Sequence, residues 1–243
     1  MLKFGENHPV AFEFILIVMS FAAAALFSVT GNVFYLHPDF GTSAGRMIVA
    51  AALLIIFIYR GALRGSSVFT NPLIVLPALL FPAWNIFYNL SSGMTIGGIP
   101  FFAEGILTAL APALFEEVIF RGIFISNLRK NNRSDRYCLF VTAAVFALIH
   151  LTNIVGMSMA GVLVQLGYSF VIGLVLAAVY LKNGSLLQIV IVHFLIDYTN
   201  SIFAEQASIS SVLHLIIFVL LLAAEAAYAI VITADDNLTR PAH

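Results

Sequence analysis

Charged side chains are scarce in this sequence. Lys, Arg, Asp and Glu make up 9% of its 243 residues, and apolar residues make up 61%. A soluble domain carries about 25% charged residues, so this chain lacks the polar surface that water requires. The net charge of -1 also excludes the basic surface of a nucleic-acid-binding protein. Because Cys138 is the only cysteine, an internal disulfide and a zinc-thiolate cluster are both excluded.

Long apolar runs dominate instead, and about 20 such residues cross a lipid bilayer. We expect an all-α fold, a polytopic transmembrane bundle of about eight helices. It forms a single transmembrane domain over residues 1–243, with a functional core at about 100–200. The first run is longer than the apolar core of a signal peptide, so we expect it to be retained. The predicted spans lie near residues 9–36, 46–60, 68–90 (kinked by three prolines), 100–128, 137–152, 157–181, 185–204 and 208–233.

The basic residues are distributed unevenly between the two sides of such a bundle. One side receives only Arg46. The other receives Lys3, Arg60, Arg64, Arg129, Lys130, Arg133, Arg136, Lys182 and Arg240. Cytoplasmic loops are enriched in Lys and Arg, so both termini are predicted to be cytoplasmic. The short loops are typical of a prokaryotic inner (cell) membrane protein, and no pattern specifies an oligomeric state.

Ionisable residues within the predicted spans are costly in lipid and mark function or paired interior contacts. Three short patterns hold most of them: Glu116-Glu117-Val-Ile-Phe-Arg121, Phe146-Ala-Leu-Ile-His150 and His193-Phe-Leu-Ile-Asp197. Residues four apart share one helix face, and Glu116, His150 and Asp197 each lie roughly 18–20 Å from the cytoplasmic ends of their spans. Three helices therefore bring polar groups to a similar depth. The remaining buried ionisable residues are Glu104, His214 and Glu225, to which we assign no chemistry.

A carboxylate beside an imidazole can activate water and protonate a leaving amine, the two proton transfers that peptide hydrolysis requires. A second imidazole can stabilise the oxyanion. An alternative is a zinc ion held by Glu116, His150 and His193, with an open position for water. Glu117 and Arg121 fit either a buried structural ion pair or a direct catalytic role. For Pro112, one turn before Glu116, we expect irregular backbone beside a polar cavity.

At these residues the chain resembles the CPBP family, also called Abi, which comprises type II CAAX prenyl endopeptidases and bacteriocin-processing or immunity proteins. The three motifs occur in the family's order between about Glu104 and Asp197. The resemblance implies that Glu116 and His150 activate water. It places His193 and Asp197 at the oxyanion and Glu117 and Arg121 in support.

Asp197 departs from the eukaryotic-type pattern, which has Asn at this position. An ionised Asp cannot donate a hydrogen bond to an oxyanion. Asp197 is therefore protonated, or orients His193, or helps to bind a metal.

Three functions fit the sequence. The leading hypothesis is an intramembrane endopeptidase that cuts a membrane-associated peptide or protein, of the CAAX type or a bacteriocin leader, near the cytoplasmic half of the bilayer. A proteolytically silent regulator or immunity protein that acts through helix contacts is the second. A proton-coupled transporter is the third, although transporters often show two matching halves and none is visible here.

Overall fold

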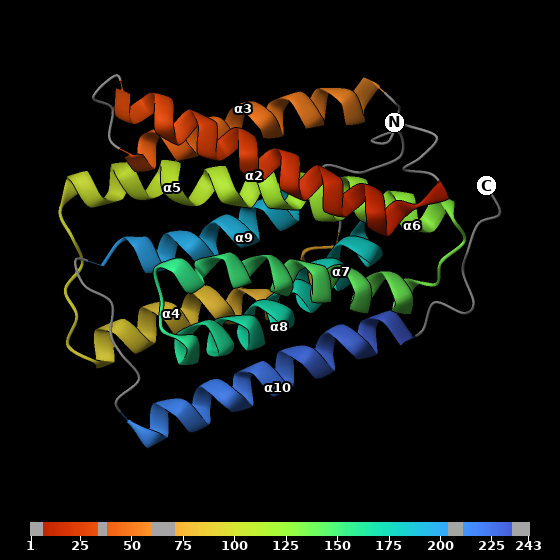
Figure 1. Cartoon of the computed structure of the whole chain (residues 1–243). Helices are drawn as coiled ribbons and strands as arrows, with labels where there is room; N and C mark the ends of the chain where they lie inside the picture. The colour runs from red at the N-terminus through yellow and green to blue at the C-terminus, as the bar shows by residue number, and fades with distance from the viewer. Residues whose placement is uncertain (1–6, 34–37, 60–70, 204–210, 235–243) are drawn as a thin grey trace.

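The computed structural model describes residues 7–33, 38–59, 71–203 and 211–234 as a bundle of helices (Figure 1). Within these ranges β-sheet pairing is limited to one isolated bridge between Ile96 and Phe203. The predicted all-α class is therefore confirmed. The α-helices are α2 (Pro9–Val33), α3 (Pro38–Tyr59), α4 (Leu80–Ser91), α5 (Ile99–Glu117), α6 (Ser126–Lys130), α7 (Asp135–Ile149), α8 (Met159–Asn183), α9 (Leu186–Ser201) and α10 (Val212–Ala234).

Each predicted span corresponds to one helical segment. The third is interrupted, as its prolines predict: two 3₁₀ turns, Pro72–Ile74 and Pro77–Leu79, precede α4. Proline lacks the N–H that a regular helix needs, so each turn begins at a proline. The fourth segment is one long helix, in which a π-helix, Val118–Ile125, connects α5 to α6.

Within the described ranges, four helical segments are long and apolar enough to cross a membrane: Val10–Phe27, Asp135–Val155, Met159–Asn183 and Val212–Ala234. Two shorter apolar stretches, Thr42–Ile55 and Leu186–Ser201, accompany them. The chain is thus a multi-pass integral membrane protein.

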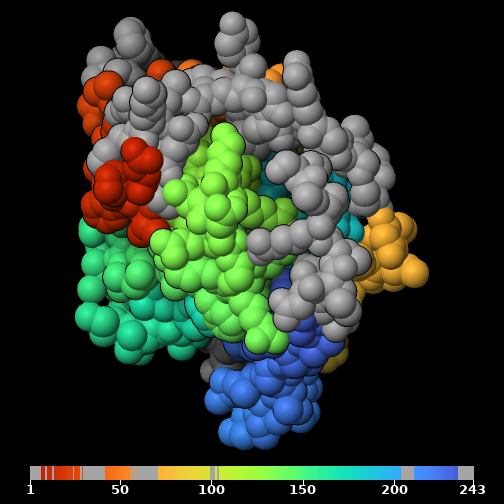
Figure 2. Space-filling view, turned by 90° about the vertical axis from the view of Figure 1, so that its right-hand side faces the viewer, coloured from red at the N-terminus to blue at the C-terminus, as the bar shows by residue number. Residues whose placement is uncertain are grey.

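Helix α2 begins and α10 ends at the same end of the bundle (Figure 1). Arg129 and Lys130, in the last turn of α6, lie at the same end, which we call the basic end. Figure 2 views the bundle from here, with the bright green end of the long helix at the centre, α2 (red) beside it and α10 (blue) below. The cytoplasmic placement of this end remains a prediction. Of the other basic residues predicted on this side, Lys3, Arg60, Arg64 and Arg240 lie outside the described ranges.

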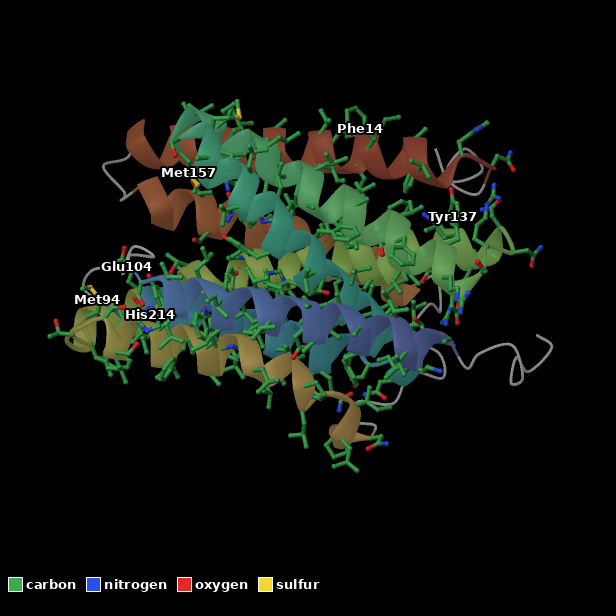
Figure 3. The ribbon with its side chains drawn as sticks, turned by 90° about the horizontal axis from the view of Figure 1, so that it is seen from below. Phe14, Met94, Glu104, Tyr137, Met157 and His214 are labelled. Atoms are coloured by element: carbon green, nitrogen blue, oxygen red, sulfur yellow. The ribbon has the colours of Figure 1, made fainter. Side chains whose placement is uncertain are left out.

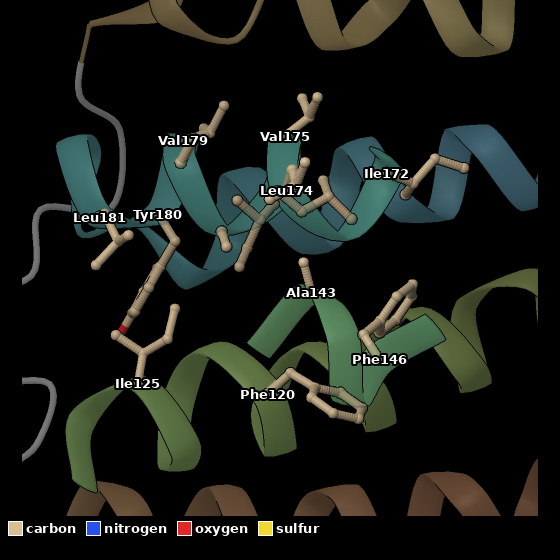
Figure 4. Packing of buried hydrophobic residues seen from close by; sticks show 14 of the residues in the cluster. Phe120, Ile125, Ala143, Phe146, Ile172, Leu174, Val175, Val179, Tyr180 and Leu181 are labelled. Carbon is tan, nitrogen blue, oxygen red and sulfur yellow. The ribbon is translucent and has the colours of Figure 1, made fainter. Parts of the chain in front are cut away.

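Small residues let α8 approach α7 closely at the centre of the core (Figure 4). Ser169, Gly173 and Ala177 are buried and lie at intervals of four on α8. A Cβ atom added to Gly173 would lie 3.1 Å from the Cα of Ala143 and 3.2 Å from the Phe146 ring. Gly173 therefore sets the separation of the two helices beside the polar groups described below.

We expect Gly173→Val to destabilise the bundle by about 1–3 kcal/mol, because the added atoms would push α7 and its Phe146 ring away from α8. The measurement is the apparent melting temperature of the purified protein in detergent. Gly167→Val is the matched control, since Gly167 lies on the same helix with no atom near its Cβ position. Equal melting temperatures for the two variants would contradict the packing role.

Candidate active site

The long helix carries the first group of candidate residues. Glu116 is buried, and Glu117 and Arg121 are completely inaccessible to solvent. Irregular backbone is predicted at Pro112, but α5 continues as an α-helix through that proline to Glu117. The irregularity begins at the next residue, where the π-helix starts, and Arg121 lies within it. π-Helical turns inside α-helices occur frequently at functional sites.

Arg121 is held by groups from two helices. Its NH1 donates to Glu117 Oε1 over 2.9 Å, and its NH2 donates to the carbonyl oxygen of Gly173 over 3.0 Å. The guanidinium also lies 4.8 Å from the centroid of the Phe146 ring, a cation–π contact. The predicted ion pair is thus present in full burial. Arg121 Nε and Glu117 Oε2 have no hydrogen-bond partner among the described residues.

His193, on α9, lies at the centre of the cluster. Its Nδ1 is 2.7 Å from Glu117 Oε1, the same oxygen that accepts from Arg121. Its Nε2 faces two further carboxylates, at 3.9 Å from Glu116 Oε2 and 3.6 Å from Asp197 Oδ2. Both distances exceed a direct hydrogen bond. Three carboxylates from two helices therefore surround one buried imidazole.

The hydrogen bond to Glu117 decides which nitrogen of the His193 ring faces Glu116 and Asp197. An ionised carboxylate can only accept, so Nδ1–H of His193 donates to Glu117. The Nε2 atom is then the free nitrogen, directed at Glu116 and Asp197. His193 is thus oriented by Glu117. To orient His193 was one of the three roles considered above for Asp197, and Glu117 fills that role instead.

His150 lies just beyond the end of α7. Helix α7 ends at Ile149, and a 3₁₀ helix, His150–Val155, follows. The His150 ring donates from Nδ1 to the carbonyl oxygen of Phe146 over 2.9 Å. No hydrogen bond or ion pair joins His150 to Glu116 in the described ranges. His150 does lie within electrostatic reach of Asp197, and the Phe146 ring contacts the rings of both His150 and His193.

Two adjoining cavities lead to this cluster from the end of the bundle opposite the basic end. The inner cavity, of about 220 Å³, is lined by Thr108, Ala109, Asp197, Asn200 and Ser201. Asp197 is the one predicted site residue on its wall. Its carboxylate therefore separates the cavity from the more deeply buried Glu116 and His193.

The outer cavity shares Thr108 and Ser201 with the inner one and has a volume of about 490 Å³. It adds Arg46 and Glu104, which were assigned no chemistry from the sequence. Figure 3 places Glu104 at this end of the bundle, opposite Tyr137. One feature of the sequence could have indicated a functional role for Arg46: it is the lone basic residue predicted on its side of the bundle.

His214 lies away from these groups. It packs against the Trp84 and Tyr88 rings of α4, and its Nε2 is 3.1 Å from Ser91 Oγ. These contacts are packing contacts between helices, in keeping with the absence of any chemistry assigned to His214 from the sequence.

The predicted zinc alternative finds no support in this arrangement. Among the described residues, no group of three or more His, Cys, Asp or Glu side chains is arranged to hold a metal ion. Of the proposed ligands, His150 has no polar contact with Glu116 or His193 in the same ranges, and its ring is tied to a backbone carbonyl instead. The donor set therefore does not fit a zinc centre.

A bundle of apolar helices around a buried Glu–His–Arg cluster defines a polytopic membrane protein with a polar centre. Residues 98–199 match the family model described as type II CAAX prenyl endopeptidase Rce1-like. This segment contains all three motifs, and the predicted resemblance to the CPBP family is confirmed over it. The match supports CAAX-type intramembrane protease activity, and hence a hydrolase, in broad terms. No curated protein and no solved structure matched the chain.

We expect Arg121→Met to destabilise the protein by about 3–5 kcal/mol, because it leaves the Glu117 carboxylate with less compensation in a fully buried position. Thermal unfolding of the detergent-solubilised protein measures the effect. Arg133→Met is the control, since Arg133 is exposed and its guanidinium lies over the Tyr137 ring, outside the buried cluster. Equal melting temperatures for Arg121→Met and Arg133→Met would show that the ion pair contributes nothing to the stability of the fold.

Proposed function

We propose that the protein is an intramembrane endopeptidase that hydrolyses a peptide bond of a membrane-associated peptide or protein. The observation that carries the proposal is the convergence of Glu116, Glu117 and Asp197 on the buried His193. The family match at residues 98–199 supports the same class of reaction. Lipidated CAAX-type peptides and bacteriocin-type leader peptides are the candidate substrates.

In the proposed reaction, Glu116 is the general base. A water molecule between Glu116 Oε2 and His193 Nε2, which are 3.9 Å apart, would lie within hydrogen-bond reach of both. Its oxygen attacks the scissile carbonyl carbon while Glu116 takes its proton. The C–N bond then breaks, and Glu116 returns the proton to the leaving amine. His150, with Nε2 free, assists from the Asp197 side of the cluster.

His193 is proposed to stabilise the tetrahedral oxyanion. With Nδ1–H committed to Glu117, a protonated His193 has one remaining N–H, on Nε2. This N–H points to the side where Glu116 acts, so the same imidazole can donate to the oxyanion. Asp197 lies 3.6 Å from Nε2, a position from which an ionised carboxylate supports the positive charge of the ring. Glu117 and Arg121 keep the ring in place from behind.

We expect Glu116→Gln and His193→Gln each to lower the rate of peptide cleavage by about 10²–10⁴-fold, since each removes a proton-transfer or oxyanion-stabilising group. The assay is mass-spectrometric detection of products from lipidated CAAX-type and leader peptides, with the protein in liposomes.

Glu225→Gln and His214→Gln serve as controls, because they make the same two side-chain changes on α10, outside the cluster. Unchanged cleavage by the Glu116 variant would remove this residue from the mechanism. Absence of cleavage by the wild-type protein would instead favour a silent regulator.

We further expect hydrolysis to continue at an undiminished rate in 1,10-phenanthroline, because the proposed base is a carboxylate and not a metal-bound hydroxide. The rate is compared with and without chelator, and metal content is measured in the same sample. Loss of activity that is restored by Zn²⁺ would overturn the glutamate mechanism while leaving the protease assignment intact.

A further inference from the structure

Arg46 is the positively charged residue on the wall of the outer cavity, and the proposed chemistry does not use it. It lies on α3, is half-buried, and lines the cavity with Ser43 and Thr42 from the same helix. No described residue forms a hydrogen bond or ion pair with its guanidinium. An ionisable group within a membrane-spanning bundle is costly unless it is paired or functional, so the position of Arg46 calls for an anionic partner.

Glu104 does not provide that partner. It is the acidic residue on the wall of the outer cavity, but its side chain is exposed and no ion pair to Arg46 is present in the described ranges. On the inner side, no ion pair joins Arg46 to Asp197 in the described ranges either. The guanidinium is therefore available to a molecule that enters the cavity.

The cavity leads from Arg46 to the proposed reaction centre. Thr108 and Ser201 line both its outer and inner parts, and Asp197 lines the inner part beside His193. Along α5, Glu104 and Thr108 precede Glu116 by about 18 Å and 12 Å, at a rise of about 1.5 Å per residue. An extended peptide advances about 3.3–3.6 Å per residue, so roughly four or five residues cover this path.

A close contact between α5 and α9 fixes one wall of this path. A Cβ atom on Gly105 would lie 2.6 Å from Ser201 Oγ and 3.3 Å from the Tyr198 ring. The hydroxyl of Thr108 is held by the carbonyl oxygen of Glu104 at 3.0 Å. The part of the wall formed by α5 and α9 is thus built from closely packed helix surface, and the hydroxyl groups of Thr108 and Ser201 belong to it.

We propose that Arg46 binds a carboxylate of the peptide substrate, and so selects substrates with a negative charge a few residues from the scissile bond. The planar guanidinium forms paired hydrogen bonds with a carboxylate, which gives both affinity and orientation. The carboxylate is either the C-terminal α-carboxylate or an acidic side chain. This assignment rests on the proposed endopeptidase function, because it assumes that the substrate lies in the cavity that ends at Asp197.

A binding experiment tests Arg46 without requiring hydrolysis. The probe is a fluorescein-labelled, farnesylated CAAX-type peptide in three forms: the C-terminal acid, the C-terminal amide, and the amide with Glu as its last residue. Fluorescence anisotropy is measured with the full-length protein in detergent, in the Glu116→Gln background. We expect the acid, the Glu-containing amide, or both to bind more tightly than the plain amide by about 10- to 100-fold. The form that binds tightly identifies the source of the carboxylate.

The Arg46→Gln variant should abolish this preference, Arg46→Lys should retain part of it, and Arg133→Gln, at the basic end, should leave it unchanged. Equal binding of the three forms to the starting protein, or no binding of any form, would overturn the proposal. So would a loss of affinity in Arg46→Gln that is the same for all three forms, since this would indicate a structural or lipid-headgroup role.

Kinetics then separate this inference from the proposed function. With Glu116 restored, Arg46→Gln should raise KM for the preferred form and leave kcat nearly unchanged. If the charge preference is present but no peptide is cleaved, the carboxylate site stands and the endopeptidase assignment fails. If cleavage depends on Glu116 but does not discriminate between the three forms, the endopeptidase stands and the role of Arg46 fails.

Discussion

The shared oxygen of Glu117 constrains the centre of this molecule. It accepts hydrogen bonds from Arg121 and from His193, at 2.9 Å and 2.7 Å, with no solvent access to either Glu117 or Arg121. Arg121 in turn donates to the backbone of Gly173. The long helix, α8 and α9 are therefore tied together through one carboxylate. A shift of any of the three would leave a charged group uncompensated inside the bilayer, where water cannot replace the lost partner.

Such a cluster is a weak source of stability, because desolvation of buried ions offsets most of their attraction. Its physical effect is orientation. Glu117 fixes Nδ1 of His193, and the carbonyl oxygen of Phe146 fixes Nδ1 of His150, so that Nε2 of each ring is left free. Gly173 adds to this, because its missing side chain lets the Phe146 ring lie against Arg121 and both imidazoles. Helix packing and ring orientation are thus parts of one arrangement.

Apolar run length and proline positions were sufficient to predict the eight helical segments, and helical spacing predicted the Glu117–Arg121 pair. The partner of His193 could not be predicted, because adjacent glutamates differ by about 100° around a helix and only the packing of α9 decides which one the ring meets. The 3₁₀ turn that repositions His150 has no sequence signature of its own. Arg46 reaches the cavity through the contact of α3 with α5, a relation between distant segments that local patterns do not encode.

The π-helix at Val118–Ile125 affects both the alignment of this sequence with homologues and the design of variants in this segment. Its hydrogen-bonded rings contain one more residue than those of an α-helix, so it behaves as a local insertion. A change of this segment to ordinary α-helical winding, with its number of residues unchanged, would rotate everything downstream by about 100°. Arg129 would then turn away from Asp135 and from the carbonyl of Leu181, both of which it now contacts. A homologue that lacks this extra residue must therefore be aligned with a gap here, or its basic helix end will be assigned to the wrong face.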